Sequence, residues 1–211
     1  MGCQVILGPM ICKKTHIFLI LICLIPGGVL AGPLDEIRRN PQWMAQVQEV
    51  ILGAVENNFG KAQTLPQDLG SPLQKPQALF VTAKKDGRVR GCMGTLQAKE
   101  ASLAEEIVVN LQKAFSQDPR HHPIQKSETS GMEIFLTVVG KPIRVHRVDT
   151  LNPARDSVLI RHGNKTGVVL AGEAKTLRYL LAFAKAKAGI KKGEPYQVFR
   201  LPSQTLSWTL P

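Results

Sequence analysis

Apolar residues recur every three or four positions in three segments of the chain, the spacing of an amphipathic helix that buries one face. The first segment covers residues 43–54, the second follows Ser102, and the third runs from about 173 to 188. Ser102 stands three residues before a glutamate, a capping-box pattern that marks the start of the second helix. Gly189 suits the end of the third helix, because glycine readily takes the left-handed conformation found there. The pattern therefore predicts three helices.

Shorter apolar runs between these helices predict strands. The expected strands are a hairpin at 80–96, a strand at 132–139, a second hairpin at 158–170, and strands at 196–201 and 205–208. The first hairpin turns at Asp86-Gly87, where both residues can take positive φ. Residues 58–76 are rich in Pro, Gly, Gln and Asn and are expected to form a long loop. Hairpins interspersed with helices, with no internal repeat in the sequence, predict an α+β domain with a mainly antiparallel sheet.

The first 31 residues follow the order of a secretory signal peptide. Two lysines precede an apolar run at 17–25, and a Pro-Gly-Gly segment separates that run from small residues at 29–31. A run of this length is shorter than the ~20 residues of an ordinary membrane span. We expect export to the periplasm or the extracellular space after cleavage near Ala31, with an uncleaved membrane anchor as the alternative. Met10 is an alternative start to Met1.

Charge and cysteine content narrow the classes of partner. The 211 residues carry a formal net charge of +11, and residues 32–211 carry +9, because the preceding segment holds two lysines and no acidic residue. This charge favours encounters with phosphates, nucleic acid, anionic lipid or acidic polymers. Aromatic residues make up only 5% of the chain and do not interleave with basic residues, so no platform for single-stranded nucleic acid is predicted. Contact with a membrane is expected only through an uncleaved leader. Cys92 is the only cysteine after residue 31, which excludes a disulfide within 32–211.

The most distinctive stretch is Arg90-Gly91-Cys92-Met93-Gly94-Thr95, at the end of the first hairpin. The glycines on either side of Cys92 allow a close approach of backbone or ligand, and Arg88 and Arg90 would lower the pKa of the thiol. The same pattern suits a buried structural cysteine whose glycines pack under a helix. A cysteine nucleophile also needs a base, and the histidines at 121, 122, 146 and 162 show no diagnostic spacing.

A second candidate segment is Asp118-Pro119-Arg120-His121-His122-Pro123. Arg120 would hold a carboxylate or phosphate through two parallel hydrogen bonds, with Asp118 orienting it. The alternative is a helix-terminating loop tied by an Asp–Arg contact. Zinc sites need three or four ligands, which the adjacent histidines do not supply, so no metal site is predicted and no cofactor is identified. The lysines at 175, 185, 187, 191 and 192 are expected on the solvated side of the last helix.

The hexamer and its hairpin resemble the Arg-Gly-Cys-Ile-Gly-Thr signature of the AMMECR-one domain family. The resemblance is clearest over 79–206, where 115–123 is similar to the family's Ala-Phe-x-Asp-Pro-Arg-Phe-x-Pro segment and 187–190 to its Lys-Ala-Gly-Leu. Residues 169–173 depart from the family's Leu-Leu-Pro-Gln, and the leader is a second departure, so the chain resembles an exported, divergent member. The resemblance implies that 32–211 form a two-lobed α+β domain with a cleft.

Two hypotheses for function follow. In the first, a cleft beside Cys92 binds a small anionic ligand or an acidic segment of a partner, without catalysis. Its expected lining residues are Arg90, Gly91, Gly94, Thr95, Asp118 and Arg120. In the second, Cys92 is the nucleophile of a thiol-dependent enzyme that acts on an anionic substrate. Accessibility of the thiol separates the two, because a nucleophile must be reachable.

Overall fold

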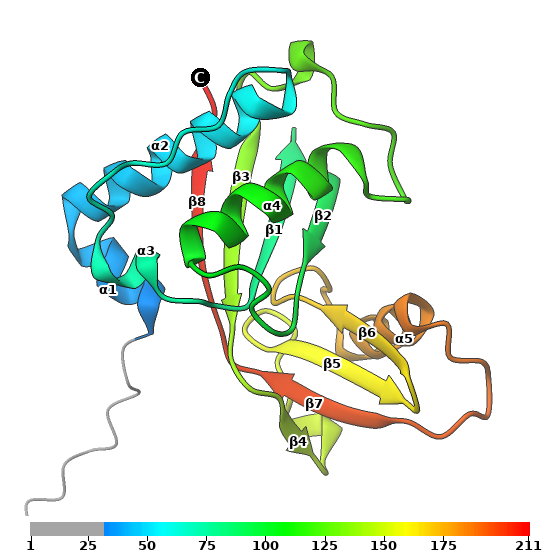
Figure 1. Cartoon of the computed structure of the whole chain (residues 1–211). Coiled ribbons are helices and arrows are strands. Elements are labelled where there is room, and N and C mark those ends of the chain that lie inside the picture. The colour runs from blue at the N-terminus through cyan, green and yellow to red at the C-terminus, as the bar shows by residue number, and fades with distance from the viewer. Residues whose placement is uncertain (1–31) are drawn as a thin grey trace, which may run out of the picture. The chain divides into compact units, whose positions relative to one another are not determined.

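Two four-stranded antiparallel sheets form the framework of residues 32–211, the part of the chain that the computed structural model describes (Figure 1). The expected signal peptide, its cleavage near Ala31 and the choice between Met1 and Met10 lie outside these residues. The predicted α+β fold is confirmed, and all sheet pairings are antiparallel. The strands divide between two sheets, which agrees with the two lobes that the family resemblance implies.

The large lobe comprises residues 32–139 and 203–211. Its sheet has the order β2-β1-β3-β8, with β1 at Leu79–Lys85, β2 at Arg88–Gly94, β3 at Glu133–Val139 and β8 at Ser203–Thr209. Its helices are α1 at Pro33–Arg39, α2 at Pro41–Asn58, α3 at Ser71–Gln74 and α4 at Leu103–Ser116. A 3-10 turn occupies Lys126–Glu128.

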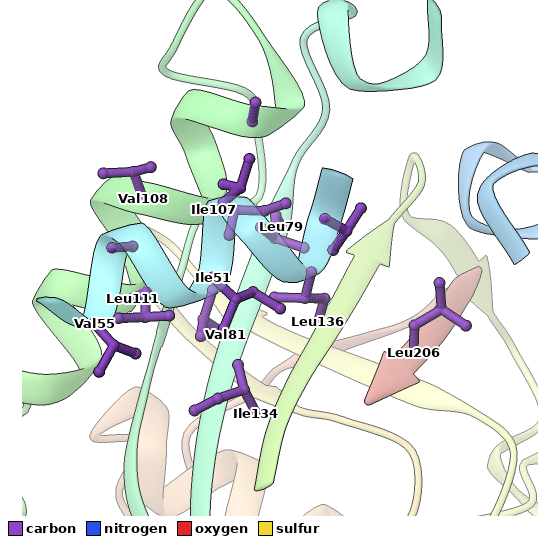
Figure 2. Close-up of a cluster of buried hydrophobic side chains, with 14 of the residues drawn as sticks. Ile51, Val55, Leu79, Val81, Ile107, Val108, Leu111, Ile134, Leu136 and Leu206 are labelled. Carbon is purple, nitrogen blue, oxygen red and sulfur yellow. The ribbon is translucent and has the colours of Figure 1, made fainter. Parts of the chain in front are cut away.

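Helices α2 and α4 cover one face of this sheet and enclose the main hydrophobic core (Figures 1 and 2). The predicted helical stripe of α4 is confirmed, since Ile107 and Leu111 are fully buried against the sheet. Full burial of each such side chain contributes about 1.5–3 kcal/mol. The hydroxyl of Ser102 accepts the N–H of Glu105, so the predicted cap also forms.

The small lobe comprises residues 140–202. Its sheet has the order β4-β7-β5-β6, with β4 at Ile143–Val145, β5 at Ser157–His162, β6 at Lys165–Val169 and β7 at Gln197–Leu201. A 3-10 turn occupies Val148–Thr150, and helix α5 at Leu177–Ala188 packs on β5 and β6 over a second, smaller core. Helix α5 begins later than the predicted residue 173, because the hydroxyl of Thr176 accepts the N–H of Tyr179 and starts the helix there. Gly189 ends it with φ of 63°, as predicted.

The sequence pattern does not predict three of the helices and strands. Helix α1 is short, and its two buried side chains give too little periodicity to detect. Helix α3 lies inside the expected loop at 58–76, where a proline at the first turn starts a helix of only four residues. Strand β4 has three residues and only one partner strand, so it carries no alternation.

The topology contains a repeat that the sequence does not show. In each half of the chain a hairpin, a helix and a strand follow one another, as β1-β2-α4-β3 and as β5-β6-α5-β7. The strand that comes next then joins the sheet of the other half, with β4 beside β7 and β8 beside β3. Each lobe is therefore completed by a strand from the other half. Sequence comparison misses this repeat because the shared feature is the order of strands.

Corresponding glycines let each hairpin approach its helix. Gly91 on β2 faces the carbonyl of Ala114 in α4, and Gly167 on β6 faces the carbonyl of Ala184 in α5. A Cβ atom at either glycine would lie closer to that carbonyl oxygen than real contacts allow. Gly91 is thus required by the packing of β2 against α4. Of the two roles that the sequence left open for this glycine, ligand approach or packing under a helix, the structure shows packing.

We predict that Gly91→Ala destabilises the fold by about 1–3 kcal/mol, because neither backbone can yield to the added methyl group. Gly53→Ala in α2 is the control, since its added Cβ meets the flexible end of Gln63 at 3.0 Å and the carbonyl of Thr64 only at an ordinary contact distance of 3.7 Å. Urea unfolding followed by circular dichroism measures both. Equal stability of the two variants would contradict the proposed close contact.

Candidate functional site

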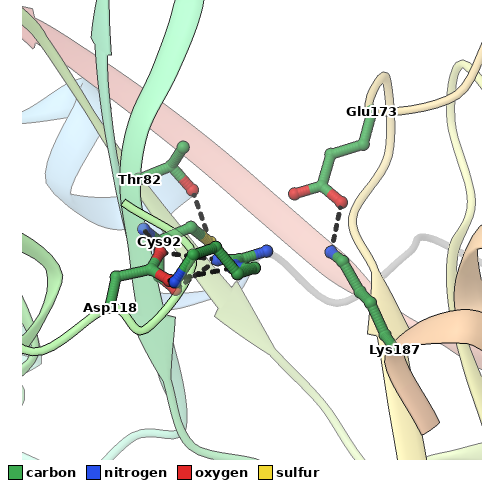
Figure 3. A network of polar contacts seen from close by, with 6 residues as sticks. Thr82, Cys92, Asp118, Glu173 and Lys187 are labelled. Atoms are coloured by element: carbon green, nitrogen blue, oxygen red, sulfur yellow. Dashed lines mark hydrogen bonds and ion pairs between the residues drawn. The ribbon is translucent and has the colours of Figure 1, made fainter. Parts of the chain in front are cut away.

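A bulge in β2 determines which way Cys92 points. The pairing runs from Ala83 opposite Gly91 to Lys84 opposite Val89, so Arg90 is the extra residue on β2. Since Gly91 faces helix α4 and side chains alternate along a strand, Cys92 points to the sheet face that α4 does not cover. There it lies opposite Thr82 on β1, whose hydroxyl donates to the cysteine sulfur at 3.1 Å (Figure 3).

The segment after α4 closes the free edge of β2 at Cys92. Asp118 accepts the N–H of Cys92 at 2.8 Å, and Nη2 of Arg120 donates to the carbonyl of Cys92 at 3.0 Å. Asp118 and Arg120 also pair with each other, with 2.7 Å between Nη2 and the carboxylate. Both predicted members of this segment therefore lie beside Cys92, and their Asp–Arg contact also forms.

Asp118 is a buried carboxylate whose charge is well compensated. Its side chain is only 2% exposed. Burial raises the pKa of this carboxyl, but hydrogen bonds from the side chain and backbone of Arg120 and from the N–H of Cys92 outweigh burial and lower the pKa to about 2. The ionised form is therefore held in place at neutral pH and fixes the position of Arg120.

The small lobe places an ion pair on the other side of the cleft. Lys187 of α5 donates to Glu173, which follows β6, at 2.8 Å (Figure 3). Both side chains are mostly buried, at 18% and 16% exposed. The sequence pattern placed Lys187 on the solvated side of its helix, which is wrong. Lys187 lies seven residues, or two helical turns, after the buried Leu180, so it falls on the buried face of α5. This spacing could have predicted its inward position.

Two adjoining cavities occupy the cleft. The larger has a volume of about 610 Å³ and the smaller about 440 Å³, and Cys92, Arg120, Glu173 and Lys187 line both. Apolar side chains on the larger cavity come from both lobes: Phe80, Met93, Leu96, Val168 and Leu170. His121 lines the smaller cavity. A ligand held here would contact charged groups of both lobes at once.

The remaining hexamer residues mainly support the structure. Arg90 turns away at the bulge and pairs with Glu128 at 2.7 Å. Thr95 donates through its hydroxyl to Glu106 at 3.2 Å and through its N–H to Leu79 at 3.0 Å. Gly94 lines the larger cavity, whereas Gly91, Arg90 and Thr95 do not.

The thiol of Cys92 is not activated in this structure. Burial raises its pKa above the ordinary value, and the hydrogen bond from Thr82 only partly offsets that effect. The expectation that Arg88 and Arg90 lower this pKa is wrong. The cations that lower it are Lys187 and Arg120, by less than burial raises it, whereas Arg90 pairs with Glu128. A protonated thiol at neutral pH is a weak nucleophile.

Residues 32–211 contain neither a cluster of metal ligands nor a helix that could span a membrane. Within this range no three His, Cys, Asp or Glu side chains gather in a way that would hold a metal ion. Nor does any helix in the same range have the length and apolar character needed to cross a membrane.

These observations define a two-lobed α+β protein with a charged cleft between its lobes. The sequence profile of the AMMECR1 family matches residues 48–205. The chain belongs to this family, in agreement with the hexamer and its hairpin.

Several relatives and one solved structure are similar to the chain. A Clostridium acetobutylicum protein is 32% identical over 124 residues, which cover 58% of this chain but only 26% of that protein. A Thermotoga maritima protein is 31% identical over 145 residues, covering 64% of this chain and 82% of the relative. An uncharacterized protein from Pyrococcus horikoshii has a similar crystal structure, with a TM-score of 0.67. At 18% identity over 79% of this chain and 91% of that one, it supports the fold alone.

We predict that Asp118→Asn lowers stability by about 2 kcal/mol at pH 7, the free energy equivalent of a pKa lowered from 3.8 to about 2. Because the folded-state pKa lies below the ordinary value, this stabilisation is present above about pH 4 and is lost as the pH falls through about 2. Asp149→Asn is the control, since Asp149 also pairs with an arginine two residues away but is exposed. Unfolding in urea at pH 7 and pH 2.5 measures the effect, and a pH-independent difference would contradict it.

We further predict that Cys92 reacts slowly with a maleimide at pH 7 in the folded protein and quickly in denaturant. The reason is that the raised pKa leaves little thiolate at pH 7 and that the side chain is half-buried, although it lines both cavities. Peptide mapping by mass spectrometry separates Cys92 from the chain's three other cysteines. Fast labelling of the folded protein at neutral pH would favour the thiol-dependent enzyme.

Proposed function

We propose that this protein binds a small anionic ligand, or an acidic segment of a partner, in the cleft beside Cys92. The proposal rests on one observation: both cavities are lined by Arg120 of the large lobe and Lys187 of the small lobe. Apolar walls surround these cations, and electrostatic attraction is stronger in such partly desolvated surroundings than in open water. The favoured ligand therefore has an anionic group and an apolar part.

Both cations already have a carboxylate partner, which shapes how a ligand would bind. Arg120 uses Nε and Nη2 for Asp118 and the Cys92 carbonyl, and its Nη1 makes no hydrogen bond within 32–211. This nitrogen and the two N–H groups of Lys187 that do not bond Glu173 are the donors left for a ligand in the cleft. Since Asp118 holds Arg120 in one position, a ligand anion would meet a guanidinium whose orientation is already fixed.

The rival function, a thiol-dependent enzyme, has less support. A nucleophilic cysteine usually has its pKa lowered by nearby positive charge. Here burial raises the pKa of Cys92, and Glu173 across the cleft acts in the same direction. These effects outweigh Thr82, Lys187 and Arg120, which lower the pKa. Binding without chemistry at the sulfur fits this arrangement better.

A panel of probe anions tests the proposal, with phosphate, citrate and benzoate added in turn while thermal unfolding is followed. A binding anion raises the unfolding temperature, because ligand at 100 times its Kd stabilises the folded state by about 2.7 kcal/mol. For the probe that binds, Lys187→Gln and Arg120→Gln are expected to weaken affinity by about tenfold or more, since a charged hydrogen bond contributes about 1.5–3 kcal/mol.

Arg147→Gln is the matched control, because it removes an Arg–Asp pair of the same spacing from the exposed surface. It should leave affinity unchanged. If no probe raises the unfolding temperature, or if Arg147→Gln weakens binding as much as Lys187→Gln, the cleft is not the anion site.

A further inference from the structure

The net charge of residues 32–211 is confined to one lobe. The small lobe, residues 140–202, holds 13 Lys and Arg residues and 4 Asp and Glu residues, a net charge of +9. The large lobe, residues 32–139 and 203–211, holds 12 of each and is neutral. Such an asymmetry creates a strong positive potential at one end of the molecule and orients it toward a negatively charged partner.

All four acidic residues of the small lobe are already paired. The pairs are Arg147–Asp149, Arg200–Asp156, Lys187–Glu173 and Lys165–Glu194. Nine cations in this lobe therefore have no acidic partner within 32–211: Lys141, Arg144, Arg155, Arg161, Lys175, Arg178, Lys185, Lys191 and Lys192. Their charge is left for a partner or for solvent ions.

Five of these cations line two hollows that adjoin at Tyr196. One hollow, of about 540 Å³, is lined by Arg144, Arg161 and His162. The other, of about 330 Å³, is lined by Lys185, Lys191 and Lys192 and by Glu194, whose charge is paired with Lys165, and Tyr196 borders both hollows. We call Arg144, Arg161, Lys185, Lys191 and Lys192 the basic belt.

The belt passes from one face of the small sheet to the other. Val158 and Ile160 of β5 pack on helix α5, so Leu159 between them faces the other side of the sheet. Arg161 lies two residues after Leu159, and Arg144 is opposite Phe199, which is itself opposite Leu159, so both arginines face away from α5. Lys185 belongs to α5 itself, and Lys191 follows its end. A partner that contacts the whole belt must therefore turn around the end of the lobe.

Cations already cover the aromatic rings along this path. The ammonium of Lys185 lies 5.2 Å from the ring centre of Tyr196, and the guanidinium of Arg161 lies 5.4 Å from that of Phe199. Ring faces occupied in this way are poor platforms for stacked bases. The chemistry along the belt is thus one of spaced positive charges, without base recognition.

We propose that the basic belt binds a flexible sulfated polysaccharide chain that wraps around the end of the small lobe. A nucleic acid duplex fits poorly, because its persistence length of about 50 nm does not allow a turn around a lobe of this size. Single-stranded nucleic acid loses its usual stacking sites to Lys185 and Arg161. A linear sugar polymer with sulfate groups needs only spaced cations, and arginine in particular binds such oxyanions through two N–H groups.

The belt and the cleft are separate sites. None of the five belt residues lines either cavity of the cleft. The proposal for the belt therefore stands or falls independently of the anion site beside Cys92.

Binding of a fluorescent heparin dodecasaccharide to the full chain, measured by anisotropy over a range of salt, tests the belt. The belt variant carries Arg161→Gln, Lys185→Gln, Lys191→Gln and Lys192→Gln. The matched control carries Arg39→Gln, Lys75→Gln, Lys99→Gln and Lys126→Gln, which remove the same charge from exposed positions of the large lobe. We expect the belt variant to bind at least tenfold more weakly at 150 mM salt, with a shallower salt dependence, and the control to change affinity less than threefold.

Three outcomes would overturn the proposal. Equal weakening by both variants would mean that net charge alone attracts heparin. Tighter binding of a single-stranded DNA oligomer of equal charge would assign the belt to nucleic acid. A full effect from Arg161→Gln alone, with none from the Lys191→Gln and Lys192→Gln pair, would mean that the chain does not turn around the lobe. Thermal unfolding of each variant confirms that the fold is intact.

Discussion

The architecture depends on a two-stranded antiparallel ribbon that joins the lobes. One strand of it leads from β3 to β4 and the other from β7 to β8, side by side. The ladder between β3 and β8 ends with Val139 opposite Ser203, the N–H of Gly140 donates to the carbonyl of Pro202 at 2.8 Å, and the ladder between β4 and β7 begins with Ile143 opposite Arg200. Continuous hydrogen bonding across the junction limits how the sheets can move against each other. The width of the cleft, and the placing of Cys92 against groups of the other lobe, follow from this ribbon.

Asp118 and Arg120 have two roles at the site: they bond the backbone of Cys92, and they place a guanidinium beside the cavities. The free edge of β2 would leave the N–H and carbonyl of Cys92 without partners, and such groups are costly when buried. Asp118 and Arg120 satisfy them. The same contacts hold a guanidinium rigidly at the mouth of two cavities. The charges of the cleft are balanced pair by pair, Asp118 with Arg120 and Glu173 with Lys187, so selectivity there must come from geometry more than from net charge.

The sequence predicted the fold well wherever a single element carried its own signal. The N-cap at Ser102, the turn at Asp86-Gly87 and the end of α5 at Gly189 are all set by neighbouring residues, and all three formed as expected. The site was harder, because it is made by contacts across the lobes. The pattern led to Asp118 and Arg120 but not to Glu173 or Lys187. The spacing from Leu180 can place Lys187 on the inward side of α5, but it does not reveal that α5 lies across the cleft from β2. The exchanged strands were hidden for the same reason.

The exchange of β4 and β8 has a consequence for how the molecule can be divided. The two halves look like separable modules, yet a chain cut between β4 and β5, near Asn152, would give two fragments that each lack the fourth strand of their sheet. Neither fragment would bury its core alone, and each would expose an unpaired edge that the other supplies. The pieces can fold only as a complex with each other. The protein is therefore two lobes in shape but one unit in cooperativity, and damage to either core will loosen both walls of the cleft.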